Sequence, residues 1–104
     1  MDDGLKRALA GDFEERDFHG ATVRIRHLSA NERLDMVSRY SAEVDGEKAV
    51  GFYQEIITRT VEGVSESDAQ TLRDASWPRF KELADLSLGV NKMGGSDVEG
   101  MAGN

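Results

Sequence analysis

The chain contains no cysteine, one proline and only 7% aromatic residues among its 104 positions. Without cysteine it forms neither disulfides nor thiolate metal sites, which is typical of proteins that work in a reducing cytoplasm. No apolar run approaches the roughly 20 residues of a membrane-spanning helix. The first residues have neither the basic start nor the apolar segment of a signal peptide. We therefore expect a cytoplasmic protein that does not insert into membranes.

Basic residues are also scarce. The chain has 13 Lys and Arg against 20 Asp and Glu, and the resulting formal net charge of −7 is spread evenly along the sequence. The one basic cluster is Arg24, Arg26 and His27, followed by Arg33. Two arginines two positions apart on a strand point to the same side of the sheet. This basic face either binds an anion or is simply exposed to solvent. Because nucleic-acid binding requires a basic patch, we expect no nucleic acid among the partners.

The length of the chain predicts a single domain. We place this globular domain at residues 1–92. Residues 93–104 are rich in glycine and have no periodicity, so we expect them to form a flexible tail. The expected fold class is α+β and mainly helical, with an N-terminal β-hairpin, three or four amphipathic helices and the flexible C-terminal tail.

The first part of the chain predicts a short helix and the hairpin. Residues 2–10 place their leucines on one side of a helix, but so short a helix is unstable unless it docks on another element. Polar and apolar residues alternate over 22–26, as they do in a half-buried strand. Residues 13–18 are the expected partner strand and 19–21 the turn. We expect the apolar side of this hairpin to lie on the helices.

A capping box follows the hairpin. Ser29 and Glu32, three positions apart, satisfy each other's backbone amides at the start of a helix. The helix that they open is expected to run to about Glu43. Arg33 falls inside its apolar arc, where it either extends its guanidinium to water or pairs with an acidic residue of a partner.

The clearest signal in the sequence is an amphipathic helix over 47–62, which Gly63 ends. A short helix is expected around 68–74, and a last helix over 76–91 carries Pro78 in its first turn. The apolar half of the 47–62 helix consists of Ala49, Val50, Phe52, Tyr53, Ile56, Ile57, Thr60 and Val61.

No residue pattern indicates catalysis. His19 and His27 fall in a turn and at a strand end, without carboxylates at metal-ligand spacing. The sequence contains no nucleophile elbow, no phosphate-binding loop and no dinucleotide-binding motif. We therefore expect a protein that is not an enzyme and has no catalytic residue, no bound metal and no cofactor.

The remaining candidates are surfaces. The apolar face of 47–62 and the side chains around Trp77 exceed what one short helix buries. They either pack on each other as the core or leave part of the face for an apolar helix of a partner. Trp77 is the expected anchor, because tryptophan is enriched in binding hot spots. The candidate partner-binding residues are Arg33, Tyr53, Ile57, Val61, Trp77, Phe80 and Leu83.

Several segments resemble a known family. The chain reads LKRALAGDFE over 5–14, VRIRHLSANER over 23–33 and FYQEII over 52–57, with a leucine-rich helix near its end. In this order the segments are similar to the tail assembly chaperones of long-tailed bacteriophages, especially the small acidic ones of actinobacterial phages and prophages. The likeness covers about residues 2–91. Its most characteristic part is the joint between the basic strand and Leu-Ser-Ala-x-Glu-Arg.

The resemblance implies a function without catalysis or cofactor. Such proteins bind the long helical tape measure protein in the host cytoplasm, keep it soluble during tail assembly and leave before the virion matures. A longer form, made by ribosomal frameshifting, commonly recruits the tail tube protein. The sequence leaves open whether the protein forms a homo-oligomer. It also leaves two alternative functions open: an acidic decoy that occupies a basic, nucleic-acid-binding site, and a minor structural protein that remains in the tail.

Overall fold

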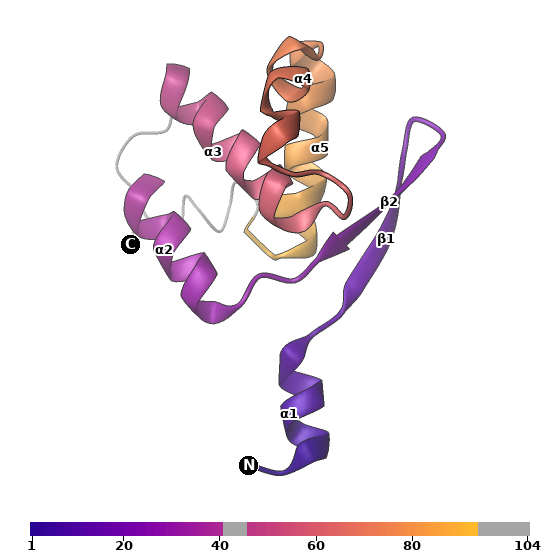
Figure 1. Ribbon diagram of the computed structural model, residues 1–104, viewed down its shortest axis with the longest axis vertical. Helices are drawn as coiled ribbons and strands as arrows, with labels where there is room; N and C mark the ends of the chain where they lie inside the picture. The colour runs from indigo at the N-terminus through magenta and orange to yellow at the C-terminus, as the bar shows by residue number, and fades with distance from the viewer. Residues whose placement is uncertain (41–45, 94–104) are drawn as a thin grey trace.

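The protein is mainly helical, with one small antiparallel sheet (Figure 1). The computed structural model describes residues 1–40 and 46–93. This architecture confirms the predicted α+β class, in which an N-terminal hairpin precedes the larger helices. The elements are α1 (Asp3–Ala10), β1 (Phe13–Phe18), β2 (Ala21–Arg26), α2 (Ala30–Tyr40), α3 (Gly46–Thr60), the 3-10 helix η1 (Glu66–Asp68), α4 (Ala69–Asp74) and α5 (Trp77–Val90).

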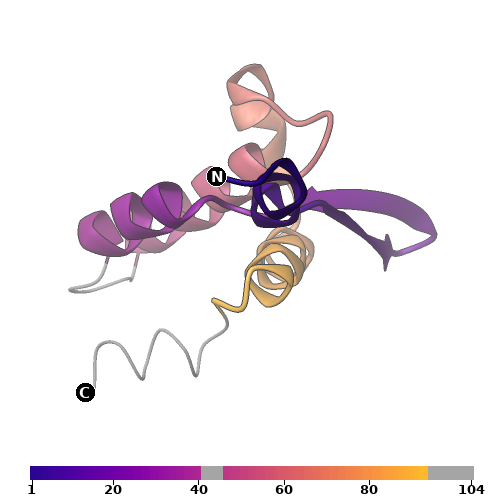
Figure 2. The same ribbon diagram turned by 90° about the horizontal axis from the view of Figure 1, so that it is seen from below.

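The hairpin forms where the alternating pattern predicts it. β1 and β2 pair antiparallel over their full lengths. The two turn residues, His19 and Gly20, have φ angles of 50° and 86°, the left-handed conformation that the tightest hairpin turns need at both positions. The hairpin extends to one side of the helices (Figure 2). Its apolar side nevertheless packs on them as expected, because Ile25 of β2 is fully buried.

α3 ends earlier than the sequence pattern predicts. The apolar periodicity continues to residue 62, but the helix ends at Thr60. The next residue, Val61, forms a β-bridge with Ile25. The amide of Glu62 donates a hydrogen bond of 2.9 Å to the carbonyl oxygen of Arg24. The chain leaves the helix to pair with the outer edge of β2, and this pairing satisfies backbone groups that an uncovered edge strand would expose.

α3 is the element on which the other helices pack. α2, α4 and α5 all contact it, and Figure 1 shows it between α2 and α5. β2 closes the core from the side of the hairpin. The buried apolar side chains of this core are Ile25, Met36, Phe52, Ile56, Ile57, Val61, Phe80, Ala84, Leu88, Val90 and Met93.

Met93 corrects the expected boundary of the C-terminal tail. The tail is expected to begin at residue 93, but this side chain is 1% exposed and belongs to the core. A left-handed residue, Lys92 with φ 56°, turns the chain back after α5. The amide of Met93 then donates a hydrogen bond of 2.7 Å to the carbonyl oxygen of Leu88. The rest of the expected tail, residues 94–104, lies outside the described residues.

The joint between β2 and α2 is fixed from two sides. The predicted capping box is present, because Ser29 Oγ accepts from the amide of Glu32 at 3.1 Å and Glu32 Oε1 accepts from the amide of Ser29 at 3.0 Å. From beyond the end of α5, Asn91 accepts a hydrogen bond of 2.6 Å from the amide of Leu28. Its amide nitrogen donates to the carbonyl oxygen of Arg26 at 3.2 Å. The C-terminal end of the described chain therefore holds the entry to α2.

The remaining helices lie close to their predicted places. The short helix expected around 68–74 consists of η1 and α4. α5 begins after Ser76, whose hydroxyl accepts a backbone hydrogen bond, and Pro78 lies in its first turn. α2 ends at Tyr40, and the rest of its expected length lies outside the described residues. No helix in residues 1–40 and 46–93 combines the length and apolar character needed to cross a membrane.

α1 lies away from the other helices (Figure 1). None of its residues is buried, and Leu5 and Leu9 are 51% and 66% exposed. Asp2 caps the helix by accepting a hydrogen bond of 3.0 Å from the amide of Leu5. The docking that the sequence predicts for this short helix is therefore not found within the described part of the chain.

Truncation of Ile57 tests whether α3 anchors the core. Ile57→Ala removes part of a fully buried side chain and should lower the free energy of unfolding by about 2–4 kcal/mol. Urea denaturation followed by circular dichroism measures this change. Leu34→Ala, at a side chain that is 66% exposed, should change the free energy by less than about 0.5 kcal/mol. Equal losses for the two variants would contradict the burial of this face of α3.

Candidate partner-binding site

Three of the predicted partner-binding residues are core residues. Ile57 is fully buried, and Val61 and Phe80 are 6% and 5% exposed. All three belong to the core between α3, β2 and α5. The prediction that these apolar faces are partly free for a partner is wrong at these positions, because α3, α5 and β2 pack on one another within the same chain.

Trp77 is the exposed corner of an aromatic triangle that it forms with Tyr53 and Phe80. The ring centroids are 6.1 Å apart for Tyr53 and Trp77, 6.0 Å for Trp77 and Phe80, and 6.2 Å for Tyr53 and Phe80. These separations are typical of favourable tilted and edge-to-face contacts. Phe80 is buried, Tyr53 is half-buried and Trp77 is 51% exposed. The indole of Trp77 therefore faces solvent, while Tyr53 and Phe80 beneath it connect it to the core.

The packing of α3 on α5 places this triangle. Trp77 and Phe80 are three positions apart on α5, so they lie on neighbouring turns of the same side. Tyr53 reaches both rings from α3, which packs along α5. Ser76 and Pro78 fix the start of α5 and with it the position of the indole. The aromatic patch thus has a defined position although it lies at a helix end.

The other two predicted residues do not join the triangle. Leu83 is half-buried and packs against the core from α5. Arg33 is half-buried on α2 and takes part in none of the ion pairs found among the described residues. The predicted set therefore separates into buried core positions, two peripheral residues and one accessible aromatic patch.

A chain of ion pairs, which no sequence motif indicates, connects β2, α2 and α3. Arg26 of β2 binds Glu32 of α2 through both terminal guanidinium nitrogens, at 2.6 and 2.9 Å. Glu32 lies 3.7 Å from Arg59 of α3. Arg59 also pairs with Asp35 at 3.1 Å and with Glu55 at 2.9 Å. Arginines and carboxylates alternate along this ion chain, so each charge beyond Arg26 has more than one partner of the opposite sign.

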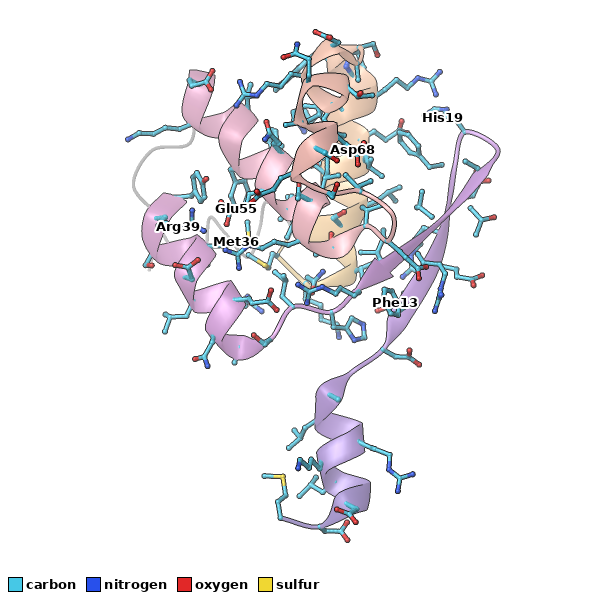
Figure 3. The ribbon with its side chains drawn as sticks, viewed as in Figure 1. Phe13, His19, Met36, Arg39, Glu55 and Asp68 are labelled. Atoms are coloured by element: carbon cyan, nitrogen blue, oxygen red, sulfur yellow. The ribbon has the colours of Figure 1, made fainter. Side chains whose placement is uncertain are left out.

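Arg39 continues the ion chain near the end of α2. It pairs with Asp35 at 2.8 Å and reaches across to Glu55 of α3, and Figure 3 shows Arg39 and Glu55 facing each other between the helices. Tyr40 donates a hydrogen bond of 3.1 Å to Glu55. These groups line a polar groove of about 800 Å³. Because Arg39 and Arg59 are already paired with carboxylates, the groove presents no unneutralised guanidinium to a ligand.

The ion chain shifts the acidity of its members. The hydrogen bonds from Arg26, and then that from the amide of Ser29, lower the pKa of Glu32 to about 2. Arg39 lowers the pKa of Glu55 below its usual value, against the opposite effect of burial. Burial, followed by the charge of Glu55, raises the pKa of the Tyr40 phenol. The carboxylates are therefore firmly ionised at neutral pH.

The basic cluster of β2 is used inside the protein as well. Arg24 pairs with Glu62 at 3.0 Å, and its guanidinium lies 4.5 Å from the ring centroid of Phe13. Such a position over an aromatic face is favourable for a cation. Arg26 belongs to the ion chain. Of the two interpretations of these arginines, an anion grip finds no support, since both guanidinium groups already have partners.

Neither the placement of possible metal ligands in the described part of the chain nor similarity to known proteins identifies a second site. Among residues 1–40 and 46–93, no three histidine or carboxylate side chains are placed to hold a metal ion. No family model, curated protein or solved structure matches the chain. Its geometry alone makes the aromatic triangle around Trp77 the candidate partner-binding site.

Acid should destabilise the protein through the ion chain. A carboxylate whose pKa is lowered by folding stabilises the folded state above its ordinary pKa, and this contribution is lost as the pH falls toward the lowered value. For Glu32 the loss should occur as the pH falls from 4.5 to about 2, and it should amount to about 1–3 kcal/mol. Glu32→Gln removes this charge and keeps the capping box, because glutamine also accepts the amide hydrogen bond.

Urea denaturation between about pH 7 and pH 2 measures the free energy of unfolding of each variant. Below pH 4.5 the value for Glu32→Gln should fall less steeply than that of the wild type. Glu47→Gln is the control, because the side chain of Glu47 is 79% exposed and its pair with Arg73 is open to solvent, and it should follow the wild type. Parallel curves for Glu32→Gln and the wild type would contradict a stabilising role of the Glu32 charge.

Proposed function

We propose that this protein is a tail assembly chaperone of a long-tailed bacteriophage, which holds apolar helical segments of the tape measure protein until the tail is assembled. The observation that carries the proposal is the half-exposed indole of Trp77 on its support of Tyr53 and Phe80. A rigidly supported tryptophan is the kind of side chain that contributes most to binding energy. The sequence likeness over about residues 2–91 supports the choice of client.

The size of the aromatic patch suits reversible binding. One indole and one partly covered phenol form a small contact, so a single chaperone is released easily. A long client offers many such contacts along its length, and the summed affinity is then high while each copy still exchanges. The net charge of −7 keeps chaperone-coated clients apart by mutual repulsion.

The alternative functions have less support. A decoy for a basic site needs its negative charge unneutralised, whereas Glu32, Asp35 and Glu55 are paired with arginines of the same chain. A structural tail protein would make the same contact with the tape measure protein but would stay in the particle. Mass spectrometry of purified virions separates these two roles, and the chaperone role requires that the protein be absent from them.

Co-expression with a fragment of the tape measure protein tests the aromatic patch. Trp77→Ala should lower the affinity for the fragment about 30-fold, the effect of losing a contact worth about 2 kcal/mol. The soluble yield of the fragment should fall accordingly. Isothermal titration calorimetry of each purified variant with the purified fragment gives the affinity.

Leu34→Ala is the matched control, because Leu34 is a 66% exposed apolar side chain on α2 and not part of the triangle. It should solubilise the fragment as well as the wild type does. Circular dichroism shows whether each variant remains folded. A folded Trp77→Ala variant with wild-type affinity would refute the proposed contact.

A further inference from the structure

α1 carries an apolar stripe that no described part of its own chain covers. Leu5, Ala8 and Leu9 lie within one arc of the helix, and Asp2 and Lys6 lie beside this arc on one flank. Leu5 and Leu9 are 51% and 66% exposed, and no residue of α1 is buried. An isolated helix of eight residues is marginal in water, so its stability requires a surface that covers the stripe.

The joint between α1 and β1 holds the helix away from its own body. The amide of Asp12 donates to His27 Nδ1 at 3.1 Å, and the amide of His27 donates to the carbonyl oxygen of Asp12 at 3.2 Å. Because Nδ1 accepts, Nε2 of His27 carries the proton and donates to Glu14 at 2.7 Å. Gly11 has φ 72°, and a Cβ there would lie 2.9 Å from His27 Nδ1. This packing fixes the direction of α1 and keeps its stripe off the core.

We propose that the stripe pairs with the same stripe of a second copy of this chain, in an antiparallel pair of α1 helices related by a two-fold axis. In such a pair each flank of one helix meets the same flank of the other in reverse order. Asp2 and Lys6 lie one turn apart on a single flank. Asp2 therefore faces the partner's Lys6, and Lys6 faces the partner's Asp2. The flank is complementary in charge to itself.

The dimensions of the helix agree with this pairing. A two-fold axis at Leu5 brings Leu5 against the partner's Leu5. With a rise of about 1.5 Å per residue, Asp2 then lies within about 3 Å of the partner's Lys6 along the axis. Asp3 in the first turn and Arg7 in the last turn lie on the opposite face of α1 and leave the stripe free for this contact. The two helix dipoles oppose each other, which adds to the attraction.

The pair should be weak because it is small. Two eight-residue helices cover far less than the roughly 800 Å² per partner of a standard interface, so we expect a dissociation constant above about 1 µM. A client helix is the less suitable occupant, since only a second copy necessarily repeats the Asp2–Lys6 pattern. The proposal concerns α1 alone and does not depend on the contact of a client with Trp77.

Sedimentation equilibrium over a hundredfold dilution from about 1 mM tests the pair. The apparent mass of the wild type should rise from that of the monomer toward that of the dimer as the concentration increases. Leu9→Glu should remain monomeric, with an unchanged unfolding midpoint because the side chain is exposed. Trp77→Ala is the control and should dimerise like the wild type.

The natural lack of cysteine allows a second, geometric measurement. Leu5→Cys, next to the proposed axis, should form a disulfide-linked dimer under mild oxidation, whereas Ala10→Cys, on the opposite side of α1, should not. Equal crosslinking of both variants, a wild type that stays monomeric at about 1 mM, or a dimer that survives Leu9→Glu would overturn the proposal. A monomeric wild type whose Leu9→Glu variant loses the tape measure fragment would assign the stripe to the client instead.

Discussion

The burial of the apolar face of α3 is the interaction on which the rest of the structure depends. Phe52, Ile56 and Ile57 are removed from water in the core that α3 forms with the elements packed around it, and each such side chain contributes about 1.5–3 kcal/mol. An exposed ion pair contributes at most about 1 kcal/mol, so the apolar face decides where the elements pack. The chain even leaves the helix after Thr60 to extend this contact along β2. Only surfaces outside this core remain for partners.

The ion chain has a different role, because it positions an element that the core holds weakly. α2 buries a single side chain, Met36. Val37 and Tyr40 pack against the core as partly buried side chains. The remaining connections of α2 to the body are the arginine–carboxylate pairs with β2 and α3 and the hydrogen bonds at its start. Pairs of this kind specify which groups meet rather than adding much stability. We therefore expect the position of α2 to depend on pH and salt.

The parts of the fold with local signals were predictable from the sequence. The hairpin turn, the capping box of Ser29 and Glu32 and the start of α5 each depend on residues within one turn of each other. What covers an apolar face is not a local property. Ile57 and Trp77 carry the same apolar signal on helices, yet one is fully buried and the other is 51% exposed. For the same reason the sequence singled out Arg33, whereas the ion chain uses arginines that meet their partners only after α2 packs on α3.

Hydrogen exchange of the backbone amides tests most directly whether α3 is the buried anchor of this fold. In dilute solution the amides of α3 should exchange only through global unfolding, with protection equal to the free energy of unfolding, while those of α1 should exchange with little protection. Exchange of the α3 amides as fast as that of the α1 amides would contradict the account, because it would show that the apolar face of α3 opens to solvent without unfolding of the protein.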